Sequence, residues 1–153
     1  METCKITKPF LKWVGGKTQI IDNIMSKFPD EMNNYHEIFL GGGSVLLALL
    51  SYKKHNLITI TNEIYAYDLN EALINVYKCI QETPLDLYNE IQILLNEYKN
   101  IQFNTINRKP DNIEEALTSQ ESYYYWIRQK YNAQSIDEKN SIKAPAMFIF
   151  LNK

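Results

Sequence analysis

The chain has 153 residues, of which 45% are hydrophobic, 22% charged and 12% aromatic, and this composition is typical of about one globular domain. It excludes a disordered chain, a collagen-like repeat and a small disulfide-stabilised protein. The formal net charge is −2, so the sequence as a whole lacks the strongly basic character of many nucleic-acid-binding domains.

The sequence contains no signal for a membrane, secretion or a bound metal. No apolar run approaches the ~20 residues of a membrane span, and residues 1–8 lack the apolar centre of a signal peptide. Neither Cys4 and Cys79 nor the two histidines have the spacing of zinc ligands. We therefore expect an intracellular, soluble protein with no metal site and no membrane partner.

The first 70 residues alternate between short apolar segments and glycine-containing turns. The predicted elements are a helix over 19–28, a strand over 36–40, a glycine turn over 41–43, a helix from 45 and a strand over 58–67, split near 61–62. A strand, a glycine turn and a helix in this order are typical of the opening of a nucleotide-binding α/β unit. Two strands do not make a stable doubly wound sheet, so we expect the sheet to be incomplete.

The second half of the sequence is predicted to be mainly helical. The predicted elements are helices over 71–81, 84–98 and 115–131, a polar loop over 100–114, a polar link over 135–141 and an apolar run over 144–153. Pro84 suits the first turn of its helix. Because nothing after the apolar run could bury it, we expect this run to need a partner from outside these residues.

Gly16-Lys17-Thr18 resembles the end of a phosphate-binding P-loop, Gly-x-x-x-x-Gly-Lys-[Ser/Thr]. The first glycine of that motif would stand at position 11, which is a leucine. The spacing therefore argues against an NTP-binding P-loop.

Gly41, Gly42 and Gly43 resemble the start of a dinucleotide fingerprint, but its third glycine would stand at position 46, which is Leu46. Such a turn lets backbone approach a ligand and lacks the glycine used around a pyrophosphate. Asp68, 25 positions beyond Gly43, could accept hydrogen bonds from both ribose hydroxyls. These features together are what S-adenosylmethionine would need. The alternative is that the glycines only form a turn and Asp68 caps the following helix.

Two further groups of residues have a functional and a purely structural interpretation. Trp13 and Lys17 could place an aromatic face and an ammonium beside one ligand, or Trp13 could pack on the sheet while Lys17 is solvated. The aromatic cluster Tyr123–Trp126 could stack on nucleic-acid bases, although such a cluster more often divides between core and surface.

These segments, in this order, resemble the Dam-type, or D12 class, DNA adenine methyltransferases. The resemblance covers nearly the whole chain. Its motifs are residues 10–17, with Phe-Leu-Lys-Trp-Val-Gly-Gly-Lys, residues 37–45, residues 67–77, the Tyr-Tyr-x-x-Arg-x-x-Tyr-Asn segment over 124–132, and the apolar run over 146–153.

The resemblance implies the N-terminal part of a Rossmann-like S-adenosylmethionine-dependent methyltransferase fold with a helical insertion. Residues 1–82 would begin the cofactor-binding domain, and residues 83–153 would form a helical region leading into a target-recognition domain. By the same resemblance, the residues that bind S-adenosyl-L-methionine are Trp13, Lys17, Gly41, Gly43 and Asp68. The reaction would be methyl transfer to the exocyclic amino group of an adenine flipped out of double-stranded DNA.

One departure from the family pattern concerns catalysis. The catalytic motif of the family is Asp-Pro-Pro-Tyr, and no Pro-Pro pair occurs in these 153 residues. We therefore expect no catalytic residue in this chain, which would supply the cofactor half of a truncated or split enzyme and be inactive alone. A second chain would then carry the catalytic half. The alternative is a non-catalytic remnant or cofactor-binding module.

Overall fold

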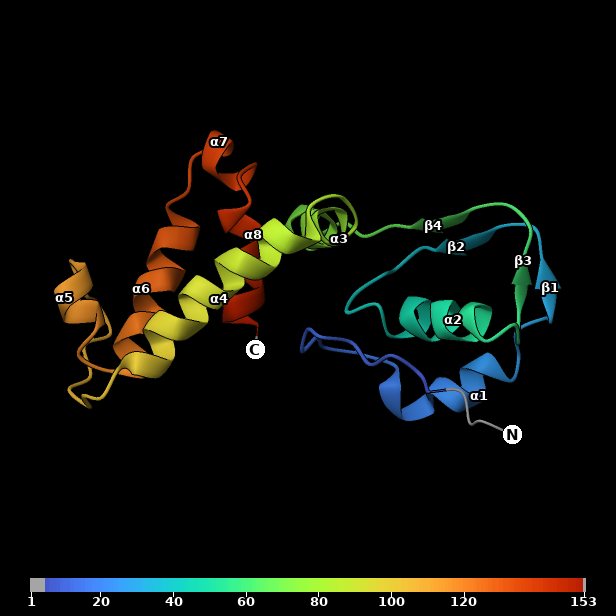
Figure 1. Cartoon of the computed structure of the whole chain (residues 1–153), viewed down its shortest axis with the longest axis horizontal. Coiled ribbons are helices and arrows are strands. Elements are labelled where there is room, and N and C mark those ends of the chain that lie inside the picture. The colour runs from blue at the N-terminus through green and yellow to red at the C-terminus, as the bar shows by residue number, and fades with distance from the viewer. Residues whose placement is uncertain (1–4, 153) are drawn as a thin grey trace. The chain divides into compact units, whose positions relative to one another are not determined.

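The computed structural model describes residues 5–152 (Figure 1); Cys4 and the final residue of the apolar run lie outside them. The chain divides into two compact units, Met1–Asn70 and Glu71–Lys153. Among the described residues, no helix is both long and apolar enough to cross a membrane.

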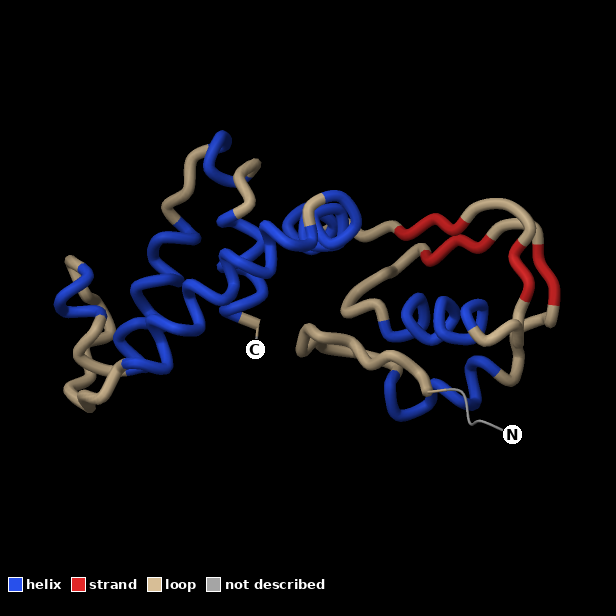
Figure 2. The backbone as a smooth tube through the Cα atoms, in the orientation of Figure 1, coloured by secondary structure: helices blue, strands red, loops and turns tan. Residues whose placement is uncertain are grey.

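The unit Met1–Asn70 is a small parallel α/β structure. Its elements are η1 (Thr18–Ile20), α1 (Ile21–Met25), β1 (Glu31–Met32), β2 (Tyr35–Glu37), α2 (Ser44–Lys54), β3 (Thr59–Ile60) and β4 (Ile64–Ala66). Strand β1 pairs with β3 and β2 pairs with β4, both in parallel. Figure 2 shows that β1 and β2 follow one another along one chain segment, and that β3 and β4 follow one another along the segment paired with it. Helix α2 is the crossover connection that parallel strands require.

The interruption of the strands has a simple cause in the register. Glu31 pairs with Thr59 and Tyr35 with Ile64. The segment that contains β3 and β4 therefore has one more residue between its two strands than the segment that contains β1 and β2. Two asparagine side chains bridge the gap: Thr61 donates to Asn33 at 3.0 Å, and the Glu63 amide donates to the side chain of the next asparagine at 3.1 Å. The predicted split near residues 61–62 is thus confirmed. Strand β1 was not predicted, because a two-residue strand has no recognisable periodicity.

The core of this unit lies between α1, α2 and the first strand pair. Its buried residues are Ile21, Met25, Ala48, Leu49, Ile58 and Ile60. Along the second strand pair the side chains alternate: Tyr35 and Glu37 are half-buried, whereas His36 is exposed and stacks on Tyr65 with 4.8 Å between ring centroids. The alternation follows from the two-residue period of a strand.

The unit Glu71–Lys153 is helical. Its elements are α3 (Glu71–Glu82), α4 (Pro84–Asn100), α5 (Ile113–Ala116), α6 (Gln120–Asn132), α7 (Ile136–Lys139) and α8 (Lys143–Leu151). The helices predicted from residues 71 and 84 are confirmed at their starts. The helix predicted over 115–131 is instead two helices, α5 and α6, separated by a short non-helical segment. The Ser119 hydroxyl caps α6 by accepting from the Ser122 amide at 2.9 Å.

The apolar run at the end of the described chain is helix α8, which packs against α3, α4 and α6. Phe150 of this helix is buried and lies edge-on to Tyr123 and Tyr98, with centroid separations of 5.8 and 5.5 Å. The expectation that this run needs a partner from outside these residues was therefore wrong. The reason is that three amphipathic helices leave an apolar space between them, and a helix without a polar face fills it.

Helix α7 lies within residues 135–141, which were predicted to be a polar link without a helix. That prediction was therefore only partly correct. Ser135 and Glu138 form a capping box, in which each side chain bonds to the backbone of the other residue. The sequence signal was present, because Ser-x-x-Glu is the capping-box pattern.

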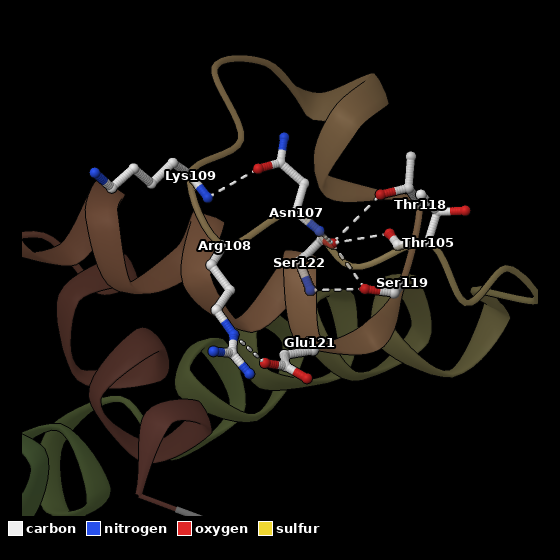
Figure 3. A network of polar contacts seen from close by, with 8 residues as sticks. All are labelled: Thr105, Asn107, Arg108, Lys109, Thr118, Ser119, Glu121 and Ser122. Atoms are coloured by element: carbon white, nitrogen blue, oxygen red, sulfur yellow. Dashed lines mark hydrogen bonds and ion pairs between the residues drawn. The ribbon is translucent and has the colours of Figure 1, made fainter.

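The segment between α4 and α6 is held by a polar network centred on the buried Ser122 (Figure 3). The Ser122 hydroxyl accepts from the Asn107 amide at 2.7 Å and lies 2.7 Å from the Ser119 hydroxyl. The Glu115 carboxylate accepts from the Asn107 side chain at 2.9 Å, and the Arg108 guanidinium pairs with Glu121 at 2.7 Å. These bonds fix the path of a segment that has little regular secondary structure.

Replacement of Ser122 by alanine is expected to lower the free energy of unfolding by about 1–3 kcal/mol, because it leaves the Asn107 amide without its acceptor. The matched control is Ser141→Ala, whose hydroxyl makes a single exposed hydrogen bond to the Glu138 carbonyl and whose loss is expected to cost less than about 0.5 kcal/mol. Urea unfolding followed by circular dichroism measures both. Equal losses in the two variants would contradict the anchoring role of Ser122.

Candidate functional site

The candidate site is built on the turn between β2 and α2. Beyond β2 the two strand segments stay paired, because the Leu40 amide donates to the Tyr67 carbonyl at 2.8 Å. The chain then turns through Gly41, with φ +50°, and Gly43, with φ +72°. These are left-handed conformations that favour glycine. Gly43 is the N-cap residue of α2, so the turn leads directly into that helix.

Trp13 lies directly against this turn. A Cβ atom on Gly41 would be 3.1 Å from Cδ1 of Trp13, and one on Gly42 would be 3.0 Å from its Cβ. Glycine is therefore needed here for the close approach as well as for the backbone conformation. The structure brings together two predicted residues, Trp13 and Gly41, that are 28 positions apart in the sequence.

Asp68 connects the end of the second strand segment to the same turn. Its Oδ2 atom accepts from the Gly41 amide at 2.9 Å, and its Oδ1 atom accepts from the Asn70 amide at 2.9 Å. The half-buried carboxylate is thus fixed at the carboxyl ends of both strands, where parallel α/β sheets bind ligands. Each oxygen keeps further acceptor capacity after one backbone hydrogen bond.

Lys17 is attached to the site through its backbone. Its amide donates to the Ser44 hydroxyl at 3.0 Å, at the first residue of α2. Its exposed ammonium donates to the Gly15 carbonyl at 2.7 Å. The charge is therefore held beside Gly15, acts on the carboxyl of Glu37 and remains open to solvent.

Glu37, the last residue of β2, is a charged group of the site to which sequence reasoning assigned no role. Burial raises the pKa of its carboxyl above the ordinary value, while a hydrogen bond from the Tyr35 hydroxyl and the charge of Lys17 oppose that shift. The same burial and the neighbouring carboxylate raise the pKa of Tyr35. The available signal was positional, because Glu37 lies within the glycine motif and on the half-buried side of its strand.

The aromatic cluster on α6 divides by burial. Tyr123 is fully buried and its hydroxyl donates to Glu97, so it belongs to the core. Lys130 lies 4.6 Å from the ring centroid of Trp126, in the range of a cation–π contact. Tyr123 therefore cannot stack on a base, and only the partly exposed members of the cluster remain available for a ligand.

No group of three or more potential metal ligands occurs among residues 5–152. The polar groups of the site are the carboxyl groups of Asp68 and Glu37, backbone amides, the Ser44 hydroxyl and the nearby ammonium of Lys17. Such a set suits an organic ligand with hydroxyl and charged groups.

Replacement of Gly41 by alanine is expected to destabilise the fold by about 2–3 kcal/mol, because it adds a contact with Trp13 to the roughly 1–2 kcal/mol cost of a left-handed residue. Gly15→Ala is the matched control, since Gly15 also has a positive φ, +78°, but a Cβ there meets nothing within 4 Å. Thermal and urea unfolding of both variants measure the difference. A loss as large in Gly15→Ala would remove the role assigned to Trp13.

The raised pKa of Glu37 also predicts a pH dependence. As the pH rises above about 4.5, the unfolded chain releases this proton before the folded chain does, so the folded state loses stability. Because the carboxyl is partly exposed, the loss is expected to be below about 1 kcal/mol. Glu37→Gln, which keeps an acceptor for Tyr35, should remove it. Unfolding between pH 4 and 8 is the measurement, with Glu31→Gln as an exposed control; an unchanged profile in Glu37→Gln would contradict the prediction.

The sequence of this chain is similar to those of known DNA methyltransferases. Residues 13–153 match the family model of the D12 class N6 adenine-specific DNA methyltransferases. The chain is 34% identical over 151 residues to the type II methyltransferase M.MjaIII of Methanocaldococcus jannaschii, which covers 95% of this chain and 45% of that protein. It is 30% identical over 146 residues to the DNA adenine methylase of Haemophilus influenzae, covering 95% of this chain and 40% of that protein.

The chain thus spans less than half the length of these relatives. The family match nevertheless extends over almost all of its residues and includes the glycine turn, Asp68 and the segment of α6 around Arg128. This chain belongs to the family of D12 class N6 adenine-specific DNA methyltransferases.

Proposed function

We propose that this chain provides the S-adenosylmethionine-binding part of an adenine-specific DNA methyltransferase with a Rossmann-like fold. The observation that carries the proposal is the hydrogen bond of 2.9 Å between the Gly41 amide and Asp68. It sets a carboxylate beside a glycine turn at the ends of two parallel strands. Membership of the methyltransferase family supports the choice of ligand.

The polar groups of the site fit this cofactor. The Asp68 oxygens have acceptor capacity for two ribose hydroxyls, and the backbone of Gly41 and Gly43 would lie against the methionine part. Trp13 offers an aromatic surface and Lys17 an ammonium for a carboxylate. The turn lacks the third glycine of a pyrophosphate site, which agrees with a cofactor that carries no phosphate.

The cofactor, when bound, supplies an electrophilic methyl group for transfer to the exocyclic amino group of adenine in double-stranded DNA. The residues of this chain bind and orient, and we assign none of them to the transfer itself. No Pro-Pro pair, and hence no Asp-Pro-Pro-Tyr motif, occurs in the sequence. Methyl transfer would therefore require residues corresponding to the part of the relatives that this chain does not span, in the same polypeptide or in a second chain.

The same observation favours a second candidate, a cofactor-binding module without catalysis. Both candidates bind S-adenosylmethionine, and they differ in methyl transfer. Transfer of a radiolabelled methyl group to adenine-containing duplex DNA separates them when the chain is supplied with a segment that corresponds to the part of the relatives it does not span, since a module transfers none even then.

Asp68→Ala is expected to weaken S-adenosylmethionine binding by roughly tenfold or more, because the buried ribose hydroxyls lose their acceptor. Isothermal titration calorimetry measures the affinity, with Asp22→Ala, an exposed acid on α1, as the control. Asp68→Asn, which keeps one oxygen for the Gly41 amide, separates the loss of ligand contacts from a loss of folding.

Two results would count against the proposal. Unchanged affinity in Asp68→Ala would show that Asp68 does not bind the ribose, and the ribose contact would then be assigned to another polar residue, such as Asn70 or Glu63. Tight binding of ATP without any response to S-adenosylmethionine would overturn the methyltransferase function itself.

A further inference from the structure

The helical unit contains a cavity between the start of α6 and the segment that precedes it. Its volume is about 430 Å³, within the range of roughly 300–1,000 Å³ that small-molecule pockets occupy. Its lining includes two tyrosine rings, an aliphatic side chain, an amide and a carboxylate: Tyr98, Tyr124, Ile106, Gln120 and Glu121. The cofactor site proposed above uses none of these residues.

The charge at the wall of the cavity is the carboxylate of Glu121. Its partner Arg108 does not line the cavity; the Arg108 Nε atom donates to Oε1 of Glu121 at 2.7 Å, and 66% of the Arg108 side chain is exposed. An exposed ion pair of this kind is weak, because water screens it. The carboxylate keeps acceptor capacity on its second oxygen, so the wall can still bind a second cation.

The surroundings of the cavity are slightly acidic even with Arg108 included. Residues 97–124, which contain the whole lining, carry five acids and three bases. They are Glu97, Asp111, Glu114, Glu115 and Glu121 against Lys99, Arg108 and Lys109. The next base along the chain, Arg128, does not line the cavity. An anion would meet a carboxylate at the wall, so the favoured charged ligand is a cation.

The two tyrosine rings of the lining add a second attraction for a cation. Tyr98 packs edge-on to Phe150 with 5.5 Å between centroids, and Tyr124 packs edge-on to Tyr125 with 5.7 Å between centroids. These contacts restrict both rings. An ammonium group within about 6 Å of the centre of an aromatic ring is attracted by the face of that ring, and proteins bind organic ammonium ligands in this way.

The other lining groups decide which kind of ammonium fits. Gln120 Nε2 donates to the Tyr98 carbonyl at 3.3 Å, which leaves its Oε1 atom as an acceptor. A primary ammonium has three N–H donors for such oxygens, as the side chain of lysine does, whereas a quaternary ammonium has none. Ile106 offers an apolar contact to the methylene groups of an alkyl chain. The lining therefore suits a primary alkylammonium.

We propose that this cavity binds the terminal ammonium group of a linear polyamine. Glu121 and Gln120 accept hydrogen bonds from the ammonium, Tyr98 and Tyr124 lie beside its charge, and Ile106 contacts the adjoining methylene groups. The proposal is independent of the proposed function, because no residue of the glycine turn takes part.

The polar network around Ser122 holds one wall of the cavity in place without a ligand (Figure 3). The Ser119 hydroxyl lies 2.7 Å from that of Ser122, and the backbone of Ser119 forms an antiparallel β-bridge with Asn104. A site that is held by its own bonds loses little conformational entropy when a ligand binds.

The test is an NMR titration of the whole ¹⁵N-labelled chain with spermidine at low salt. The amide signals of Gln120, Glu121 and Tyr124 are expected to shift with one common affinity. Spermidine acetylated at both ends is the matched ligand, because it lacks the primary ammonium groups. It is expected to bind roughly tenfold more weakly, since it cannot form the charge-assisted hydrogen bonds. Equal affinity for the two ligands would overturn the proposal.

Two variants that break the same ion pair are expected to have opposite effects. Glu121→Gln removes the carboxylate and should weaken spermidine binding by roughly tenfold. Arg108→Gln removes the competing cation and should strengthen binding by about two- to fivefold. If the pair served only to hold the fold, both variants would change the affinity in the same direction, and that result would overturn the proposal.

The aromatic contribution is tested at Tyr124. Tyr124→Ala is expected to weaken spermidine binding by roughly fivefold, and Tyr124→Phe, which keeps the ring, should retain the affinity. Phe103→Ala is the matched control, because Phe103 is 72% exposed in the same segment and does not line the cavity. Its affinity should be unchanged, and a loss equal to that of Tyr124→Ala would count against the cavity as the site.

Two further titrations identify the source of the ammonium group. The peptide acetyl-Ala-Lys-Ala-amide presents the same group on a protein side chain, and binding as tight as that of spermidine would overturn the assignment to a free polyamine. Displacement of spermidine by S-adenosylmethionine would show that both ligands use one site and would overturn the proposal of a separate one. Binding of spermidine without any binding of S-adenosylmethionine would leave this inference intact and show that the proposed function has failed.

Discussion

The hydrogen bond between the Gly41 amide and the Asp68 carboxylate is the contact on which the candidate site depends. Gly41 follows one strand segment and Asp68 follows the segment paired with it, just beyond the bond of 2.8 Å from Leu40 to Tyr67. The parallel register therefore decides which side chain meets the turn. A slip of one residue would direct Asp68 to the opposite face of the sheet.

The same turn also fixes the N-terminal segment. Trp13 approaches the glycine backbone so closely that a Cβ atom at Gly41 or Gly42 would lie only 3.1 or 3.0 Å from it, tighter than an ordinary contact. The Lys17 amide bonds to Ser44 at the start of α2. The N-terminal segment is thus held against the turn by the ring of Trp13, which packs on the glycine backbone, and by the hydroxyl of Ser44. The close approach means that the residues proposed to bind the cofactor are also residues that stabilise the fold.

The helical unit achieves order by a different means. Helix α8 has no polar face, and it is accommodated because α3, α4 and α6 each turn an apolar stripe toward it. The irregular segment before α6 has few apolar contacts of its own and is fixed instead by Ser122, Glu115 and the Arg108–Glu121 pair. Polar anchoring of this kind fixes a segment that has little regular secondary structure.

The sequence by itself determined the elements with strong local signals. Amphipathic periodicity and Pro84 located α3 and α4, and the glycine motif followed by Asp68 identified the residues that the structure brings together. The order of these motifs also identified the family. These features depend on neighbours a few positions apart, so a single sequence contains them.

Only the tertiary structure decided how the remaining residues are used. Four consecutive aromatic residues on α6 look alike in the sequence, yet Tyr123 is buried by Phe150 while Tyr124 lines a cavity. The burial of α8, the pairing of the short strand β1 with β3 and the environment of Glu37 depend likewise on contacts between distant segments. Local periodicity shows that a residue can be buried, but the packing partner that buries it is fixed only when the helices and strands assemble.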